Sequence, residues 1–370
     1  MDINYKQRSN TLTLICTILA LFIGATGMYL VIRYIPLDNT TITNINKTEK
    51  EVTVNEQGIA DAVEKIYDAV VTVENHKNGK HVASGTGFVY KTQEGKAYVL
   101  TNNHVVENSD QVFLVFTDGK RIEAKLMGSD IYADIAVLQV DEKDIVSVAK
   151  TGSSDSARIG DTVFTVGAPL DSAYSWTVTR GILSGKDRMV EVSLSRSNSS
   201  DWIMKVLQTD ASINNGNSGG PLANSNGEVI GINSLKLVSS GVEGMGFAIP
   251  IEDALEYAAK LEKGEKIIRP FLGVQMIELA DTRSQQMSGI SIPSTITSGV
   301  VIGDTTKGSP AEKGGLKKGD VVTEIEGKKC STIAQLKYNL YKYKAGDTIS
   351  LKVNSNGVEK TIKVKLVASE

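Results

Sequence analysis

Between residues 69 and 251 the chain alternates short apolar stretches with turn residues, and this pattern limits the possible folds more than any other feature. Short stretches rich in Val, Ile, Phe and Thr, bounded by Gly, Asn and Asp, are typical of β-strands. Many short strands at this spacing predict a barrel or a sandwich. Because helices and strands do not alternate, a parallel α/β sheet is disfavoured. The clearest predicted strands are residues 85–90, 97–101, 111–116, 135–140, 162–166, 228–233 and 246–249.

The rest of the chain divides around this region. Apolar residues at helical spacing predict a short helix before it and another after it, ending at Gly264, a residue favoured at helix C-termini. A second unit of roughly 100 residues follows, a normal length for a small domain. Its predicted strands are residues 271–277, 299–302, 321–325, 348–353 and 359–366, with one helix near residues 332–341.

Residues 9–32 carry no charge and are mostly Leu, Ile, Ala, Thr and Gly. About 20 apolar residues cross a bilayer as a helix, so a transmembrane anchor is predicted over residues 9–35, after a cytoplasmic tail over residues 1–8. A cleaved signal peptide is the alternative, but the run is long for a signal core and lacks a small-x-small cleavage site. The polar residues 36–57 are predicted to link the anchor to the folded part.

Composition excludes some classes of function. The net charge of −3 gives no argument for nucleic-acid binding. Cys16 lies in the apolar run, so a disulfide with Cys330 is not expected. No metal-ligand cluster or phosphate-binding loop is visible, so neither a cofactor nor a metal is predicted.

Ser218 lies in the stretch Asn-Gly-Asn-Ser-Gly-Gly-Pro and is the candidate nucleophile. A serine hydroxyl reacts only when a base and an orienting group activate it. Glycines around the serine let the backbone turn tightly and bring N–H groups together for a developing oxyanion. A simple hairpin turn is the alternative, since Asn-Gly is a strong turn signal.

His104 is the candidate base, because it directly follows an apolar strand that would hold it in place. The other histidines, His76 and His81, lie in a polar hairpin and are predicted to be solvated. Asp134 begins an Ile-Ala-Val-Leu strand, where a carboxylate needs a partner, so it is the favoured orienting group. Asp130 is the alternative but is more loop-like. The order His, Asp, Ser is the chymotrypsin-like order.

The motifs Thr-Asn-Asn-His-Val-Val, Ala-Asp-Ile-Ala-Val-Leu and Gly-Asn-Ser-Gly-Gly-Pro-Leu resemble the HtrA (Deg) family of serine proteases. The resemblance covers residues 58–370. It implies a mainly β chain: a chymotrypsin-like double six-stranded β-barrel, then a PDZ domain, here with one N-terminal transmembrane helix. The implied boundaries are residues 58–265 for the protease domain and 266–370 for the PDZ domain.

Carried onto this sequence, the resemblance implies Ser218 as nucleophile, His104 as general base and then acid, and Asp134 as its orienting group. The N–H groups of Gly216 and Ser218 would form the oxyanion hole. Asn217 stands where secreted digestive trypsin-like enzymes carry an aspartate that pairs with a new N-terminus. Activation by that route is therefore not expected.

The resemblance also indicates the S1 pocket. No acidic residue falls at its floor, so cleavage is predicted after small or medium aliphatic residues such as Val, Ala or Ile. The implied wall residues are Ser212, Ile213, Ile232, Asn233 and Ser234.

Two regulatory features are implied as well. The polar, Ser-rich residues 184–202 are expected to form a mobile loop in which Arg188 relays an activating signal; an ordinary solvated arginine is the alternative. In the PDZ domain the backbone N–H groups of a four-residue loop would hold a peptide's C-terminal carboxylate, beside the helix near residues 332–341. A PDZ domain that serves only as a spacer is the alternative. The loop consists of Phe271, Leu272, Gly273 and Val274.

The predicted function is an ATP-independent serine endopeptidase, anchored in the bacterial cytoplasmic membrane, that degrades misfolded or unfolded extracytoplasmic proteins. The family further implies a homotrimer, formed through about residues 57–67, or a higher oligomer, and C-terminal peptides as PDZ ligands. Two alternatives stay open: a regulatory protease that cuts one membrane signalling protein, and a noncatalytic chaperone or peptide-binding scaffold.

Overall fold

The computed structural model describes residues 4–34, 56–167, 176–193, 202–234 and 244–369. Residues 1–54 and 55–370 are separate compact units. The described residues of the first unit form the helix α1 (Asn4–Tyr34). Within it, Leu12–Val31 is long and apolar enough to cross a membrane and is not buried in the protein. A signal sequence near the N-terminus passes the same test of length and apolar composition.

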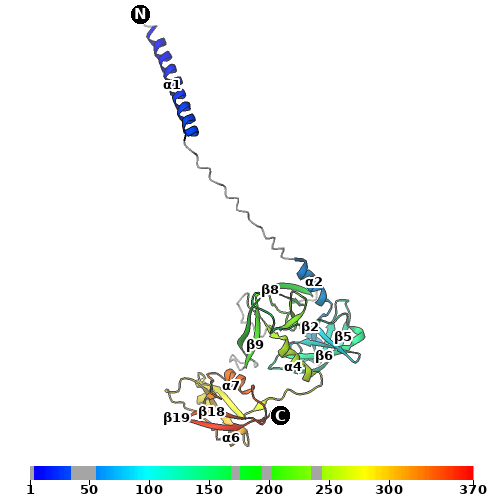
Figure 1. The fold of residues 1–370 in the computed structure, drawn as a ribbon. Helices are drawn as coiled ribbons and strands as arrows, with labels where there is room; N and C mark the ends of the chain where they lie inside the picture. The colour runs from blue at the N-terminus through cyan, green and yellow to red at the C-terminus, as the bar shows by residue number, and fades with distance from the viewer. Residues whose placement is uncertain (1–3, 35–55, 168–175, 194–201, 235–243, 370) are drawn as a thin grey trace. The chain divides into compact units, whose positions relative to one another are not determined.

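Among the described residues of the second unit, twelve strands close into the two predicted six-stranded antiparallel barrels (Figure 1). The first barrel has the order β1-β2-β3-β6-β5-β4 and the second the order β10-β11-β12-β9-β8-β7. The strands of the first barrel are β1 (Val70–Lys77), β2 (Lys80–Gln93), β3 (Lys96–Thr101), β4 (Gln111–Val115), β5 (Arg121–Asp130) and β6 (Ile135–Asp141). Those of the second are β7 (Thr162–Gly167), β8 (Thr177–Val192), β9 (Trp202–Thr209), β10 (Pro221–Asn224), β11 (Val229–Asn233) and β12 (Gly246–Pro250).

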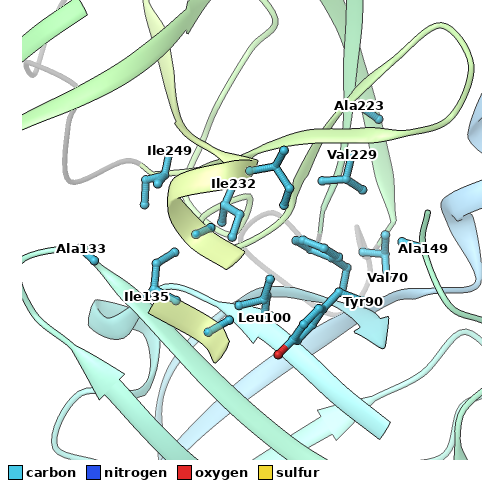
Figure 2. Close-up of a cluster of buried hydrophobic side chains, with 14 of the residues drawn as sticks. Val70, Tyr90, Leu100, Ala133, Ile135, Ala149, Ala223, Val229, Ile232 and Ile249 are labelled. Atoms are coloured by element: carbon cyan, nitrogen blue, oxygen red, sulfur yellow. The ribbon is translucent and has the colours of Figure 1, made fainter. Parts of the chain in front are cut away.

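A cluster of buried side chains joins the two barrels (Figure 2). Leu100 and Ile135 come from the first barrel and Ile232 and Ile249 from the second. Side chains alternate between the two faces of a strand, so strands such as β3 and β6 fill their own barrel with one face and contribute to this cluster with the other. The shared core fixes the position of one barrel relative to the other. It therefore also fixes the relative positions of the loops that the two barrels bring together.

Two helices complete this core. They are α2 (Glu56–Tyr67) and α4 (Ile251–Leu261), and both were predicted. Helix α2 places Ala62 and Ile66 in the cluster between the barrels. It begins inside the segment predicted as linker, most of which lies outside the described residues. Two shorter helices, α3 (Asn103–Val106) and the 3-10 turn η1 (Glu142–Asp144), follow β3 and β6.

The predicted mobile loop over residues 184–202 is strand at its described ends, while residues 194–201 lie outside the described residues. Strand β8 continues to Val192, and β9 begins at Trp202, with these two residues paired. Arg188 therefore lies within a strand, opposite Val206. Most side chains of β8 are exposed or half-buried. A strand that buries so few side chains needs few apolar residues, which is why its composition resembles that of a loop.

The C-terminal part is a six-stranded sheet, five strands of which follow one path, with α7 (Ile333–Leu340) packed on it, as the resemblance to a PDZ domain implies. The sheet has the order β14 (Val274–Glu278), β15 (Val300–Thr305), β16 (Val321–Ile325), β18 (Thr348–Ser355) and β19 (Val358–Lys365). The short strand β17 (Lys328–Lys329) pairs with β16, and β13 (Pro270–Phe271) pairs with β20 (Val367–Ala368). Two short helices, α5 (Thr282–Met287) and α6 (Pro310–Lys313), lie in the connections.

Candidate active site

His104 lies on α3, one turn of helix directly after β3. The residue before this helix, Asn102, is buried, and its side-chain amide donates a hydrogen bond to the main-chain carbonyl of Asp134 at 2.9 Å. The strand end and this bond hold the histidine backbone beside the turn that carries the aspartate. The imidazole itself is 27% exposed, so a substrate can reach it.

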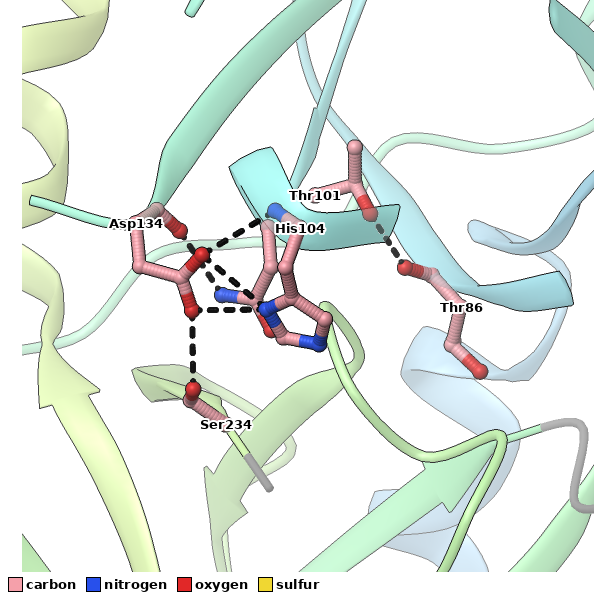
Figure 3. Close-up of polar contacts among 6 residues, drawn as sticks. Thr86, Thr101, His104, Asp134 and Ser234 are labelled. Atoms are coloured by element: carbon pink, nitrogen blue, oxygen red, sulfur yellow. Dashed lines mark hydrogen bonds and ion pairs between the residues drawn. The ribbon is translucent and has the colours of Figure 1, made fainter. Parts of the chain in front are cut away.

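Asp134 precedes β6 and has a left-handed backbone, with φ of 54°. Its carboxylate accepts hydrogen bonds from the imidazole Nδ1 of His104, with distances of 2.9 and 3.0 Å to its two oxygens (Figure 3). It also accepts a hydrogen bond from the main-chain N–H of the same residue at 3.1 Å. The hydroxyl of Ser234 donates a further bond at 2.8 Å. A side chain only 1% exposed needs such partners to stay charged. With Nδ1–H held by the carboxylate, Nε2 is left as the basic nitrogen.

Asp130 has a different set of partners. Its carboxylate accepts the main-chain N–H groups of Tyr132 at 3.0 Å and Ala133 at 2.7 Å, and it is paired with Arg269. Among the described contacts, His104 meets Asp134 and not this residue. The structure therefore brings together the pair that the sequence favours.

Ser218 lies in the turn between β9 and β10 and is bound to the first barrel. Its carbonyl accepts the N–H of Thr86 at 2.8 Å, and the hydroxyl of Thr86 donates to the carbonyl of Gly216 at 2.5 Å. The next residue, Gly219, leaves no room for a side chain, because a Cβ there would lie 2.2 Å from the carbonyl oxygen of Thr86. The first barrel thus supplies the His–Asp pair, and the second supplies the serine turn.

Gly216 is the third residue of a turn that the N–H of Asn217 closes onto the carbonyl of Asn214 at 3.0 Å. Its φ is 102°, while Asn215 does not have a positive φ. This combination is that of a type II turn, in which the third position requires a residue that accepts a left-handed backbone.

The residues predicted to wall the S1 pocket have mixed surroundings. The side chain of Ile232 is wholly buried in the cluster between the barrels (Figure 2). The Asn233 amide donates to the hydroxyl of Thr165 at 2.5 Å, and Ser234 binds the catalytic-site carboxylate described above. Ile213 is buried, while Ser212 is exposed and its carbonyl accepts the hydroxyl of Thr179 at 2.8 Å.

The contact between Ser234 and Asp134 is a feature that the sequence did not reveal. The two residues are 100 positions apart, and nothing near Ser234 distinguishes its hydroxyl from other strand-end hydroxyls. A contact between residues of two different barrels leaves no recognisable motif in the sequence around either residue.

The prediction that His76 is solvated is wrong. Its ring packs edge-on against Phe113 and contacts the carboxylate of Glu74 at 3.3 Å and the guanidinium of Arg121 at 3.1 Å. Burial opposes the charge on Glu74, but the bonds from Arg121 and His76 outweigh it and hold the pKa of that carboxyl below its usual range. His81, in contrast, is exposed, as predicted.

The loop predicted to bind a peptide carboxylate has its carbonyls turned inward. Gly273 has φ of 80°, and its carbonyl accepts the N–H of Thr306 at 2.9 Å and the hydroxyl of Ser309 at 3.2 Å. The carbonyl of Leu272 accepts the N–H of Ala311 at 2.9 Å. Within the described part of the chain, the N–H groups of Leu272 and Gly273 have no acceptor.

Two family models match this chain: the trypsin-like peptidase domain over residues 85–232 and the PDZ domain over residues 270–366. Serine protease Do-like HtrA of Bacillus subtilis (strain 168) is 40% identical over 84% of this chain and 73% of its own length. Serine protease Do-like HtrB of the same organism is 36% identical over 98% of this chain and 84% of its own length.

Solved structures agree. The serine endoprotease from Yersinia pestis superposes with a TM-score of 0.63 at 28% identity, covering 84% of this chain and 98% of that one. The HtrA-type protease AlgW with tripeptide has a TM-score of 0.60 at 32% identity, covering 84% and 97%. With both domains matched and relatives aligned over most of their length, the chain belongs to the HtrA family of serine proteases and is a serine endopeptidase with a trypsin-like peptidase domain followed by a PDZ domain.

Proposed function

We propose that this protease is anchored in the cytoplasmic membrane of a bacterium and degrades misfolded or unfolded proteins outside the cytoplasm, without ATP. The observation that supports a working catalytic site is the bonded pair of His104 and Asp134, placed where the two barrels meet beside the Ser218 turn. In this proposal Ser218 Oγ attacks the scissile carbonyl while His104 Nε2 takes its proton. Asp134 stabilises the imidazolium. The same histidine then protonates the leaving amine and activates the water that hydrolyses the acyl-enzyme.

The oxyanion would be held by the N–H groups of Gly216 and Ser218. A type II turn uses the N–H of its fourth residue to close, and leaves the N–H of its third residue outside that bond. In the described part of the chain the N–H of Gly216 has no acceptor. This geometry supports a resting site that is already competent.

The central test compares residues 56–370 of the wild-type protein with the Ser218→Ala variant, using an unfolded protein such as casein as substrate. Broad degradation by the wild type alone supports the proposal. Cleavage of very few proteins would point instead to a regulatory protease. A fluorophosphonate probe that fails to label Ser218 in the wild type would point to a noncatalytic scaffold.

Specificity is proposed to be for small or medium aliphatic residues before the cut. Ser212 and Ile213 would form one wall of S1, and the segment 232–234 the other, with Ile232 contributing only its backbone because its side chain is in the core. Without an acid at the pocket floor, a Lys or Arg side chain would find no partner. A peptide-library profile dominated by basic residues at this position would refute the assignment.

The membrane anchor is proposed to be α1, whose apolar side chains are exposed over Leu12–Val31. We propose that the protease domain spans residues 58–265 and the PDZ domain residues 266–370. N-terminal sequencing of the protein from membranes tests the anchor. A mature protein that begins after residue 32 and stays in the soluble fraction would show a cleaved signal peptide instead.

The PDZ domain is proposed to bind peptide C-termini at Phe271–Val274, with α7 as the other wall of the groove. The inward carbonyls and the available N–H groups of this loop suit a carboxylate. The relative AlgW is seen with a tripeptide and with a decapeptide. Titration with an aliphatic C-terminal peptide, and with the same peptide amidated, tests this: equal affinity for both would contradict a carboxylate site.

We also propose a regulatory residue and an oligomeric state. Arg188, on β8, would relay a signal to the active site; unchanged peptide-stimulated turnover in Arg188→Ala would contradict that role.

A homotrimer or higher oligomer is proposed through the start of the protease domain. The apolar residues Ala62 and Ile66 of α2 pack within their own chain, so subunits would meet through its other face. Sedimentation of residues 56–370 as a monomer at all concentrations would contradict it.

A further inference from the structure

We propose that Arg269 is a positioning residue for proteolysis: through Asp130 it fixes the turn that carries Asp134, and so couples the catalytic site to the first residues of the PDZ domain. This inference rests on the proposed role of Asp134. It concerns a residue outside the triad, the oxyanion hole and the peptide groove.

The contact between Arg269 and Asp130 is bidentate. Nη1 donates to Oδ2 at 2.6 Å and Nη2 donates to Oδ1 at 2.7 Å. The side chains are 12% and 7% exposed, so water screens the pair little. Planar, paired bonds between guanidinium and carboxylate set direction as well as distance. Although burial opposes its charge, the bonds to Asp130 raise the pKa of Arg269, and the side chain stays charged.

The same carboxylate shapes the turn before Asp134. Oδ1 of Asp130 accepts the N–H groups of Tyr132 and Ala133, at 3.0 and 2.7 Å, and thereby closes the chain between β5 and β6. Asp134 follows at once, with its left-handed φ of 54°. Aspartate accepts this backbone more readily than most non-glycine residues, and the bonds from Tyr132 and Ala133 to Asp130 hold the turn in which it occurs. The orientation of Asp130 therefore helps to set where the Asp134 carboxylate lies, together with the direct bonds from Asn102 and Ser234.

On its other side, Arg269 is held by the PDZ domain. Its N–H donates to the hydroxyl of Ser369 at 3.2 Å and its carbonyl accepts the N–H of the same residue at 2.8 Å. The guanidinium carbon lies 4.4 Å from the ring centre of Tyr132 and 5.7 Å from that of Tyr341, which follows α7. Tyr341 also packs edge-on against Tyr132, with ring centres 5.5 Å apart. The backbone of Arg269 is thus fixed by the PDZ domain, while its side chain bonds to Asp130 of the protease domain and lies near a tyrosine ring of each domain.

If Arg269 only stabilised the contact between the two domains, its substitution would have a different effect. It would lower the unfolding temperature but leave kcat of the folded enzyme unchanged. Loss of a positioning residue lowers kcat, because a displaced Asp134 orients His104 poorly, and leaves KM for a short peptide nearly unchanged.

The test uses the full-length chain in detergent micelles and a short chromogenic peptide, with kcat and KM measured separately. We expect Arg269→Gln and Asp130→Asn each to lower kcat about tenfold or more, since misplacement by about 1 Å costs up to about a hundredfold. The double variant should be no slower than either single variant, because both break one path. Arg269→Lys should recover part of the rate. The matched control is Arg158→Gln, which removes an exposed arginine paired with Asp161 at 3.0 Å and should leave kcat unchanged.

Several outcomes overturn the proposal. One is an unchanged kcat in Arg269→Gln with a lowered unfolding temperature, which would show that Arg269 only stabilises the contact between the domains. Another is a double variant whose losses multiply, which removes Asp130 from the path. If Arg269→Gln does not fold, the ratio of kcat between Arg269→Lys and the wild type decides, and equality refutes the proposal. A wild-type protein that cleaves no peptide would instead refute the proposed function, so the two failures are distinct.

Discussion

At the scale of single residues, a comparison of Gly219 with Gly119 distinguishes two reasons for glycine: a left-handed backbone and a lack of space for a side chain. Their φ angles are 83° and 82°, yet a Cβ on Gly219 would lie 2.2 Å from a carbonyl oxygen, whereas one on Gly119 meets nothing within 4 Å. We predict that Gly119→Ala costs about 1 kcal/mol and keeps full activity. Gly219→Ala should cost roughly 3 kcal/mol or more and lower kcat at least about a hundredfold, because the Ser218 turn must move.

Denaturant unfolding and the rate of fluorophosphonate labelling measure these two effects. Equal losses in both variants would show that the left-handed backbone, and not the close approach of the barrels, makes glycine necessary at position 219.

Ser234 belongs to the same scale. Its hydroxyl is one of the donors to the buried Asp134 carboxylate. A hydrogen bond to a charged group contributes about 1.5–3 kcal/mol, so Ser234→Ala is expected to lower kcat on the order of tenfold while the protein stays folded. Ser298→Ala is the control, because its hydroxyl bonds to Ser331 at an exposed site. Steady-state kinetics on a short peptide measure both; identical kcat values would remove Ser234 from the catalytic arrangement.

At the scale of elements, Glu252 attaches the start of α4 to the loop before β7. Its carboxylate accepts the hydroxyl and N–H of Ser154 and the hydroxyl of Ser153. Burial raises the pKa of Glu252, but the bonds, Ser154's first among them, outweigh it and leave that pKa below 4.5. The folded state therefore binds this proton less tightly than the unfolded state. The resulting stability is complete above pH 4.5 and is lost as pH falls through the lower folded value.

The Glu252→Gln variant isolates this contribution. We expect it to be less stable than the wild type at neutral pH by about 1 kcal/mol, with the difference shrinking as pH falls below 4.5. Urea unfolding across that range, on the Ser218→Ala background, measures it. A difference that stays constant with pH would show that the carboxylate's charge has no part in holding the loop.

Elements also show how far the sequence predicts this structure. Strands such as β3 and β6 have a buried face on both sides of the chain, so their apolar runs predict them, and α7 has both its capping residue, Thr332, and its apolar spacing. Strands β5 and β8 are largely exposed, and their polar sequences do not differ from loops. The contact of His104 with Asp134 is predictable because each residue adjoins a clear strand.

Contacts made across the fold are not predictable in this way. Ser234 and Arg269 reach partners 100 and 139 positions away, and their neighbours in sequence carry no sign of those partners. Such residues become visible only when the barrels and the PDZ domain are assembled.

At the scale of the whole molecule, the buried clusters divide the chain into two cooperative parts. The cluster between the barrels takes side chains from both barrels and from α2 and α4, so neither barrel can unfold without exposing the core of the other. The PDZ domain has a separate core of its own, built around residues such as Leu351 and Leu336. We therefore expect calorimetry of residues 56–370, carrying Ser218→Ala to prevent self-digestion, to show two transitions: one for both barrels and one for the PDZ domain.

Core substitutions assign these transitions. Phe164 is wholly buried between the barrels, and Leu351 is wholly buried in the PDZ core. Phe164→Ala should cost about 3–5 kcal/mol and lower only the barrel transition, by about 10 °C; Leu351→Ala should cost about 2–5 kcal/mol and lower only the PDZ transition, by a similar amount or more. A single transition that both substitutions lower equally would mean that the contacts around Arg269 and Tyr341 fuse the two cores. Because those contacts involve few residues beside two complete cores, we expect them to adjust the catalytic turn without merging the domains into one unfolding unit.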